Sequence, residues 1–275
     1  METYPHLEAA PDNGPPYPSY RELAGNFHRV NFSPAVKRLF WPFDGVFPAE
    51  ICVMKSPRSA ADNLEPYFKE TDGGDGIWHE IAQMPLTEPK VSSIEASSYD
   101  LEQWEYDWVA WHDCHSDSEY VAYGDLDDED RPYANEMKED GSWEEDSETE
   151  FLTRCCGQDR PLRKRGQKLR VTPASGNNFV TVHDWVSAVH PWLMGLRSDI
   201  FLRKNVARRP VAYPKPAEME WMVDLAIGYG PSLQLEEKKE WIQRHGGPRP
   251  PVPASVLAAM ERMRAQKRAE QAVGS

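Results

Sequence analysis

Long hydrophobic runs and the standard glycine-rich nucleotide-binding motifs are missing from this sequence. The longest apolar stretches are shorter than ten residues, whereas a membrane-spanning helix needs about 20, so we expect no membrane protein. The N-terminus has neither a basic nor an apolar segment, which argues against a secretory signal. No G-x-x-x-x-G-K-[ST], G-x-G-x-x-G or G-x-S-x-G motif occurs, which disfavours nucleotide binding by a standard loop. The sequence therefore predicts an intracellular protein, cytoplasmic or nuclear.

Cysteine is scarce, with four residues in 275: Cys52, Cys114, Cys155 and Cys156. Without a secretory signal we expect reduced thiols and no disulfide framework. The neighbours Cys155 and Cys156 are too close along the chain for an ordinary unstrained disulfide. Aromatic residues are plentiful by contrast, with 10 tryptophans and 11 tyrosines. Their large buried areas predict an aromatic-rich core.

The net charge of −14 is concentrated in one stretch. Residues 117–150 contain 15 acidic and 2 basic residues, a net charge of −13, which leaves −1 for the remaining 241 residues. The following segment, 154–170, has 7 basic residues and 1 acidic residue, a net charge of +6. An acidic block therefore precedes a basic block within a chain that is otherwise close to neutral.

Dense like charge resists burial, so we expect 124–170 to be a charged, disordered insertion that is acidic first and then basic. Its simplest role is a solvated surface loop. An alternative is docking, of a basic protein partner on 117–150 or of a polyanion on 160–170, and the basic run also resembles a nuclear localisation signal. Three serines have a glutamate three residues on, as acid-directed kinases prefer: Ser116, Ser142 and Ser147.

The remaining pattern predicts an α+β fold, with an antiparallel sheet and packed helices around this insertion. We expect a proline-rich arm at 1–20, one globular domain formed by 21–123 and 171–246, and a C-terminal helix at 250–275.

Several elements are predicted in the first half of the domain. Residues 50–54 are expected to form a short strand, and 62–70 a helical turn broken by Pro66. The alternation in W-E-Y-D-W-V-A-W predicts a half-buried strand at 104–111, with 119–123 as its partner.

In the second half, 177–201 reads as a short strand followed by a helix. Thr181 and Asp184 form a capping box, and an apolar stripe at helical spacing follows. We expect Pro191 to kink or divide this helix. The alternation in 219–227 predicts a strand, and 232–246 is either a strand that continues into a helix or a helix throughout.

The C-terminal half also carries a resemblance. The runs V-T-V-H-D-W-V-S-A-V-H-P-W-L-M (180–194), E-W-M-V-D-L (220–225) and E-K-K-E-W-I (237–242) resemble segments of an uncharacterised fungal protein family. The similarity covers about 180–245. It implies a small α+β domain and a fungal origin, and it brings no activity, cofactor or catalytic residue.

The residues with the most chemical potential lie in W-H-D-C-H (111–115). His112, Cys114 and His115 are ligands that zinc prefers. Local spacing lets only two of them converge, so a metal site needs more ligands from elsewhere: His79, Cys155 or Cys156. No C-x-x-C pair and no H-E-x-x-H motif is present. Polar residues that find partners at the end of a strand are the alternative interpretation, and we expect neither a metal nor a cofactor.

Nucleophilic catalysis by Cys114 with His112 or His115 is a second possibility, although the acidic neighbours disfavour a thiolate. His183 and His190 lie two turns apart on one predicted helix, about 10.5 Å along its axis, too far to share an ion. The sequence as a whole favours a non-catalytic interaction module that binds other macromolecules through its charged segments. The alternative is a small-molecule enzyme or a metal site centred on His112, Cys114 and His115.

Overall fold

A computed structural model describes residues 14–60, 63–71, 76–126, 150–161, 168–174, 176–206, 214–225 and 231–246. The predicted C-terminal helix at 250–275 lies outside these residues. So do most of the acidic segment (127–149), the centre of the basic segment (162–167) and the first 13 residues of the predicted arm. Helices and sheets are both present, so the chain has the predicted α+β fold.

The central feature is a four-stranded sheet in the order β12-β8-β14-β13. Its strands are β8 (Ile94–Ser98), β12 (Leu169–Val171), β13 (Trp221–Asp224) and β14 (Ser232–Glu237). The outer pairs are antiparallel and β14 pairs with β8 in parallel. The sheet is therefore mixed, whereas the sequence predicted an antiparallel sheet. Because β12 belongs to it, Leu169 and Arg170 are not part of a disordered insertion.

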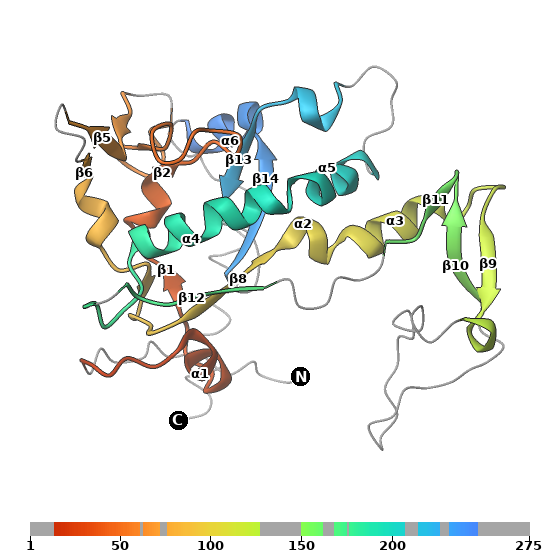
Figure 1. The fold of residues 1–275 in the computed structure, drawn as a ribbon, viewed down its shortest axis with the longest axis horizontal. Helices are drawn as coiled ribbons and strands as arrows, with labels where there is room; N and C mark the ends of the chain where they lie inside the picture. The colour runs from red at the N-terminus through yellow and green to blue at the C-terminus, as the bar shows by residue number, and fades with distance from the viewer. Residues whose placement is uncertain are drawn as a thin grey trace, which may run out of the picture.

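The helices pack on this sheet. In Figure 1, α4 and α5 run end to end across the body, and α2 and α3 lie beside α5. The helices are α1 (Tyr20–Gly25), α2 (Tyr99–Glu102), α3 (Trp104–His112), α4 (Val182–Gly195), α5 (Arg197–Val206) and α6 (Lys238–His245). Short 3₁₀ helices are η1 (Val36–Arg38), η2 (Glu80–Gln83), η3 (Tyr123–Asp125) and η5 (Pro216–Glu218).

Smaller sheets complete the body. Strand β1 (Asn31–Phe32) pairs with β7 (Thr87–Glu88), and β2 (Leu39–Phe40), β3 (Cys52–Val53) and β4 (Glu65–Pro66) form a three-stranded sheet. Strand β5 (Phe68–Glu70) pairs with β6 (Gly76–Trp78). The predicted strand at 50–54 is confirmed by β3. The predicted helical turn at 62–70 is wrong, because this segment forms β4 and β5.

A separate antiparallel sheet lies at the far end of α3 (Figure 1). It has the order β11-β10-β9 and consists of β9 (Glu119–Ala122), β10 (Glu150–Cys155) and β11 (Gln158–Asp159). The predicted strand at 119–123 is present, but its partner is β10. Residues 150–159, expected within the disordered insertion, are paired strands. The acidic segment is thus the connection between β9 and β10.

The predicted strand at 104–111 is wrong, because these residues form α3. A strand would have buried Tyr106 with Trp108, yet Tyr106 is 71% exposed and Trp108 is buried. The same apolar residues also fit helical spacing, since Trp104, Trp108 and His112 follow one another at intervals of four. Acidic residues in the first turn favour a helix start. Val109 is the only β-branched residue in the run, which weakens the case for a strand.

The capping box at the start of α4 is confirmed. Thr181 Oγ1 accepts from the Asp184 backbone N–H at 3.1 Å, and the Asp184 carboxylate accepts from the Thr181 N–H at 2.9 Å. The predicted apolar stripe is buried along this helix. Pro191 lies inside α4 and does not divide it, and α5 begins after Leu196.

The predicted strand at 219–227 is shorter than expected, since β13 ends at Asp224. Both of its faces are buried, with Trp221 and Val223 in the main core and Met222 in a second cluster with Phe40 and Trp241. The segment 232–246 is a strand that continues into a helix, as β14 and α6.

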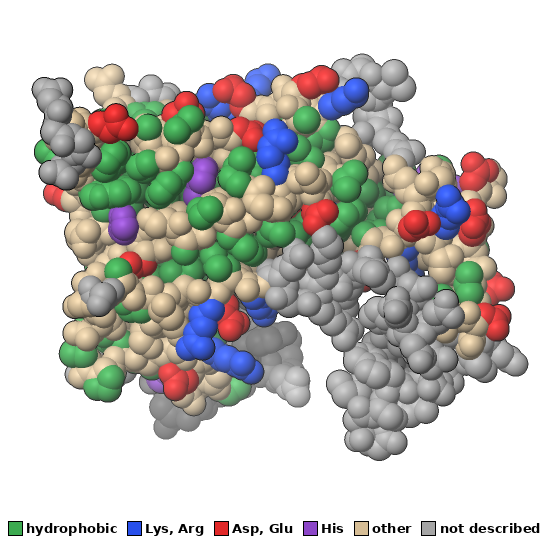
Figure 2. Space-filling model, viewed as in Figure 1, with side chains coloured by type: hydrophobic (Ala, Val, Ile, Leu, Met, Phe, Trp, Pro, Cys, Tyr) green, Lys and Arg blue, Asp and Glu red, His purple; other side chains and the backbone are tan. Residues whose placement is uncertain are grey.

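The aromatic-rich core is confirmed: five of the described tryptophans are no more than 2% exposed, namely Trp41, Trp108, Trp185, Trp221 and Trp241. Figure 2 shows hydrophobic side chains along the α4–α5 row and mainly acidic side chains over the end that carries the β9–β10–β11 sheet. None of the helices among the described residues has the length and hydrophobicity needed to cross a membrane.

Candidate metal centre

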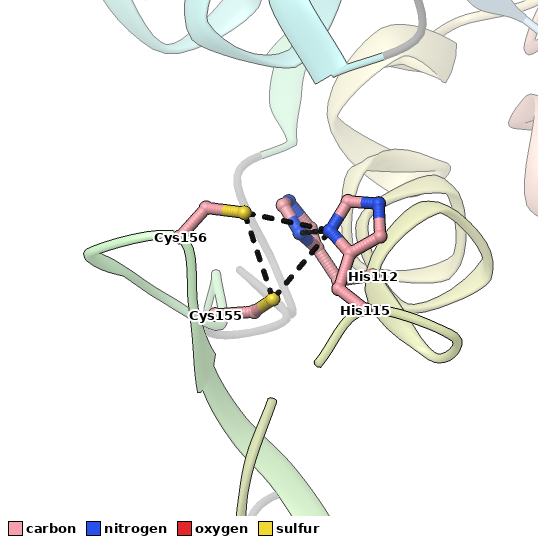
Figure 3. Close-up of side chains that lie close together, drawn as sticks. All are labelled: His112, His115, Cys155 and Cys156. Carbon is pink, nitrogen blue, oxygen red and sulfur yellow. Dashed lines mark hydrogen bonds between the residues drawn. The ribbon is translucent and has the colours of Figure 1, made fainter. Parts of the chain in front are cut away.

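Four side chains that can bind a metal meet where the β9–β10–β11 sheet contacts α3. They are His112, His115, Cys155 and Cys156, and their nearest ligand atoms all lie within 4.8 Å of one another. Figure 3 shows the two imidazoles and the two thiols directed toward a common point from opposite sides. Helix α3 and the turn after it supply the histidines, and the β10–β11 hairpin supplies the cysteines.

The histidines come together because the chain keeps a helical turn after α3. The His115 N–H donates to the His112 carbonyl at 3.0 Å, so the two residues lie one turn apart. Their Nδ1 atoms are 3.3 Å apart, and the two rings are nearly perpendicular. The Trp108 ring packs against His112 with a centroid separation of 4.5 Å, which fixes that imidazole from behind. Spacing i, i+3 on a helix therefore places both Nδ1 atoms on one side.

The cysteines are held by a tight hairpin. Cys155 pairs with Gln158 across the ladder, which leaves Cys156 and Gly157 as a two-residue turn. Both have positive φ, +51° for Cys156 and +73° for Gly157, as a type I′ turn requires. Glycine reaches this conformation without steric cost, whereas a side chain at Cys156 is strained. The turn brings the two sulfurs to 3.8 Å.

A β-bulge gives Cys155 its direction. Pairing shifts by one residue at Thr153, because Leu152 is opposite Tyr120 and Arg154 is opposite Glu119. In a regular strand, residues three apart point to opposite faces. The extra residue reverses this phase, so Leu152 and Cys155 are both buried, in one cluster with Trp108 of α3.

Two further contacts fix the hairpin against α3. The Ser118 hydroxyl donates to the His112 carbonyl at 2.8 Å, and its oxygen is 3.6 Å from Cys155 Sγ. The Arg160 guanidinium donates to Glu105 of α3 at 2.7 and 3.1 Å, and to the Leu152 carbonyl at 3.3 Å. Both partners of this ion pair are largely buried, with side chains 8% and 13% exposed. Contacts that hold the supporting residues of a metal site also hold its ligands in place.

Four of the six distances between the ligand atoms match tetrahedral zinc. With Zn–N near 2.05 Å and Zn–S near 2.3 Å, tetrahedral angles place two nitrogens about 3.3 Å apart, two sulfurs about 3.8 Å apart, and nitrogen and sulfur about 3.6 Å apart. The corresponding distances are 3.3 Å between nitrogens and 3.8 Å between sulfurs. His115 Nδ1 lies 3.7 Å from Cys155 Sγ and 3.4 Å from Cys156 Sγ.

Burial and charge also suit a structural metal. His112 is 0% exposed and Cys155 is 1% exposed, while His115 is half-buried and Cys156 is at the surface. An ion would therefore be covered on the α3 side and accessible from the hairpin side. Two thiolates balance a divalent charge, so the complete site would carry no net charge. Four protein ligands fill a tetrahedral zinc and leave no position for a substrate, which is the pattern of structural sites.

The sequence-predicted ligands are only partly brought together. His112 and His115 belong to the group, and Cys155 and Cys156 complete it. Cys114 is exposed and does not belong to it. His79 lies elsewhere, at the start of η2, where it bonds Glu65 at 3.1 Å. The signal that could have completed the set is C-C-G, a vicinal pair followed by the glycine of a hairpin turn.

His183 and His190, the other two histidines considered as ligands, have structural roles. The His183 ring contacts Trp78 with a centroid separation of 4.4 Å. His190 Nδ1 accepts from the Trp41 indole N–H at 3.1 Å, deep in the core. Burial lowers the pKa of His190, so this ring is neutral in the folded protein at neutral pH.

Comparison with known proteins finds no matching family model, no matching curated protein and no matching solved structure. The resemblance to a fungal family therefore stays a prediction.

Proposed function

We propose that this protein is a non-catalytic, zinc-stabilised interaction module. One observation carries the zinc assignment: two imidazole nitrogens and two thiol sulfurs, from segments about 40 residues apart in the chain, converge within 4.8 Å of one another. Their N–N and S–S distances and both distances from His115 to the sulfurs fit a zinc tetrahedron. Two thiolates and two imidazoles form a common structural zinc set.

The strained turn supports the same proposal. A residue other than glycine, asparagine or aspartate is uncommon where φ is positive, and the first turn position here is Cys156. Asparagine would fit that backbone with less strain. Strain of this kind persists where the side chain serves a function. At Cys156 the function that fits is a thiolate ligand.

The zinc assignment is tested by metal analysis of purified protein. We expect one zinc per chain in the wild type and loss of the ion in Cys155→Ser and in His115→Ala. Cys114→Ser and His79→Gln are matched controls, because neither residue belongs to the group. In the cobalt-substituted protein, we expect tetrahedral d–d bands and a sulfur-to-cobalt charge-transfer band that disappears when both Cys155 and Cys156 are replaced. Equal zinc content in wild type and Cys155→Ser would refute the assignment.

The interaction part of the proposal rests on where the acidic segment is attached. Ala122 of β9 pairs with Glu150 of β10, so the segment leaves and rejoins the sheet at one end. Leu126 packs against Val121 and Phe151 at the same end. The charged side chains visible on this face of the sheet are mainly acidic (Figure 2). We expect zinc to fix the base from which this segment contacts a basic protein partner.

The structure argues against a polyanion contact through 160–170, because one of the cations in this segment is not available. Arg160 is buried in its ion pair with Glu105, and Arg170 lies on β12 with its guanidinium 3.4 Å from the Ser93 hydroxyl. The basic partner of the acidic segment is therefore the contact that we favour.

A deletion and a charge-neutral variant test this contact. Residues 128–148 are replaced by a short Gly-Ser linker, or their acids are changed to Gln and Asn at constant length. We expect both variants to keep the zinc and the fold, and to lose salt-sensitive binding of a Lys/Arg-rich peptide that the wild type binds. Unchanged peptide binding by both variants would refute the interaction proposal and leave the zinc assignment standing.

A further inference from the structure

A second site lies in the body of the protein, away from the metal centre. A cavity of about 490 Å³ opens between the N-terminal segments and the β13–α6 end of the molecule. None of its lining residues is a ligand of the proposed zinc or a supporting contact of that centre. This volume is in the range of pockets that hold small organic molecules, about 300–1,000 Å³.

The cavity has an apolar floor. Val36 of η1, Leu39 of β2, Ile94 of β8 and Val223 of β13 line it, and each is no more than 4% exposed. These residues belong to the main hydrophobic core, so a molecule in the cavity would rest on tightly packed and rigid walls. A floor of this kind favours an apolar ligand body over a hydrated ion.

Two cations without a partner among the described residues line the cavity. Lys37 and Arg58 line it with exposed side chains, and neither forms a side-chain hydrogen bond or ion pair with the described part of the chain. Arg244, which also lines the cavity, is paired with Asp224 at 2.9 Å and also with Glu236. The pairing leaves Lys37 and Arg58 as the cations available to a ligand.

The lining of the cavity carries a net positive charge. Outside residues 117–150 the chain is close to neutral, and the charged side chains lining the cavity are Lys37, Arg58 and Arg244 against Asp224. Burial raises the pKa of Asp224, and the nearby Arg244 partly opposes this. Cations beside low-dielectric walls concentrate the field and raise the local concentration of anions.

We propose that this cavity binds a small organic anion, with its acid group at Lys37 and Arg58 and its apolar body against Val36, Leu39 and Ile94. The apolar floor disfavours inorganic phosphate, which has no apolar part to bury. The ligand class is therefore an amphipathic carboxylate, sulfonate or phosphate ester of drug-like size.

The probe for this site is 8-anilinonaphthalene-1-sulfonate, an aromatic anion whose fluorescence rises in apolar surroundings. Its affinity is measured for the full-length wild type, for the double variant Lys37→Gln/Arg58→Gln and for the control Lys69→Gln. Lys69 is an exposed lysine of β5 that does not line the cavity. The substituted side chains are all exposed, so the fold should be kept, and near-ultraviolet circular dichroism verifies this.

We expect saturable binding to the wild type and a dissociation constant about 4- to 25-fold higher in the double variant, at about two- to five-fold for each cation. The control should match the wild type. Uncharged 1-anilinonaphthalene should bind wild type and double variant equally, since it lacks the acid group. The proposal is overturned if the wild type does not bind the anion, if the double variant binds it equally well, or if Lys69→Gln weakens it as much.

Discussion

Removing the metal should release the β9–β10–β11 sheet while the body stays folded. The strands of this sheet contain 12 residues, and ordering a residue costs about 1–2 kcal/mol. Only two side chains of these strands, Leu152 and Cys155, are fully buried, which contributes roughly 3–5 kcal/mol. A structural zinc contributes about 10–16 kcal/mol. The apolar contacts alone therefore cannot hold the sheet, and the zinc that we propose would close the difference.

Hydrogen exchange measured by mass spectrometry checks this. We expect chelation to speed amide exchange in 119–122 and 150–159 at least about 100-fold, equivalent to about 2.7 kcal/mol of opening free energy. The amides of β13 and β14 should not respond. The double variant Cys155→Ser/Cys156→Ser should already exchange fast in this sheet and ignore the chelator. If metal analysis shows that zinc is gone and protection in 150–159 is unchanged, the sheet is stable by itself and the reasoning fails.

Two further predictions concern the body that supports α3. Asp100 is 1% exposed and pairs with Arg203 at 3.2 Å and Lys204 at 2.7 Å, so Asp100→Ala leaves two largely buried cations short of a partner. We expect a loss of about 3–5 kcal/mol in denaturant unfolding, and a loss below about 1 kcal/mol would contradict this role. Burial lowers the pKa of His190, so the unfolded chain takes up this proton first and stability falls as the pH drops below about 6.5. Between pH 7 and pH 5, the free energy of unfolding should fall by up to about 2 kcal/mol more in the wild type than in His190→Gln. Equal pH dependence in the two proteins would show that this residue is not responsible.

The sequence predicted a helix or strand correctly where the local pattern fits only one of the two. The start of α4 combines a capping box with an apolar stripe at helical spacing, and the structure has both. The segment 104–111 fits two periods, since the same tryptophans alternate and also recur every four residues. A strand that continued through 115 would place His112 and His115 on opposite faces. The helix places them on one side, so the period decides whether the site exists.

The other half of the site depends on contacts that no local pattern encodes. Cys155 points at α3 only because the bulge at Thr153 reverses the alternation of β10. Arg160 reads as part of a basic run, but it is buried against Glu105, 55 positions earlier in the chain. Pairing between distant segments decides both the direction of Cys155 and the burial of Arg160. Such pairing cannot be predicted from the local pattern of a single sequence.

The attachment of the acidic segment at Ala122 and Glu150 makes the length between them almost free to vary. Doubling a flexible loop costs only about 0.6 kcal/mol in closure entropy, which is small beside the contribution of a bound ion. The segment can therefore be lengthened or shortened while the H-x-x-H before it and the C-C-G after it keep their places. The two halves of the site are thus tied to the sheet and not to the number of residues between them.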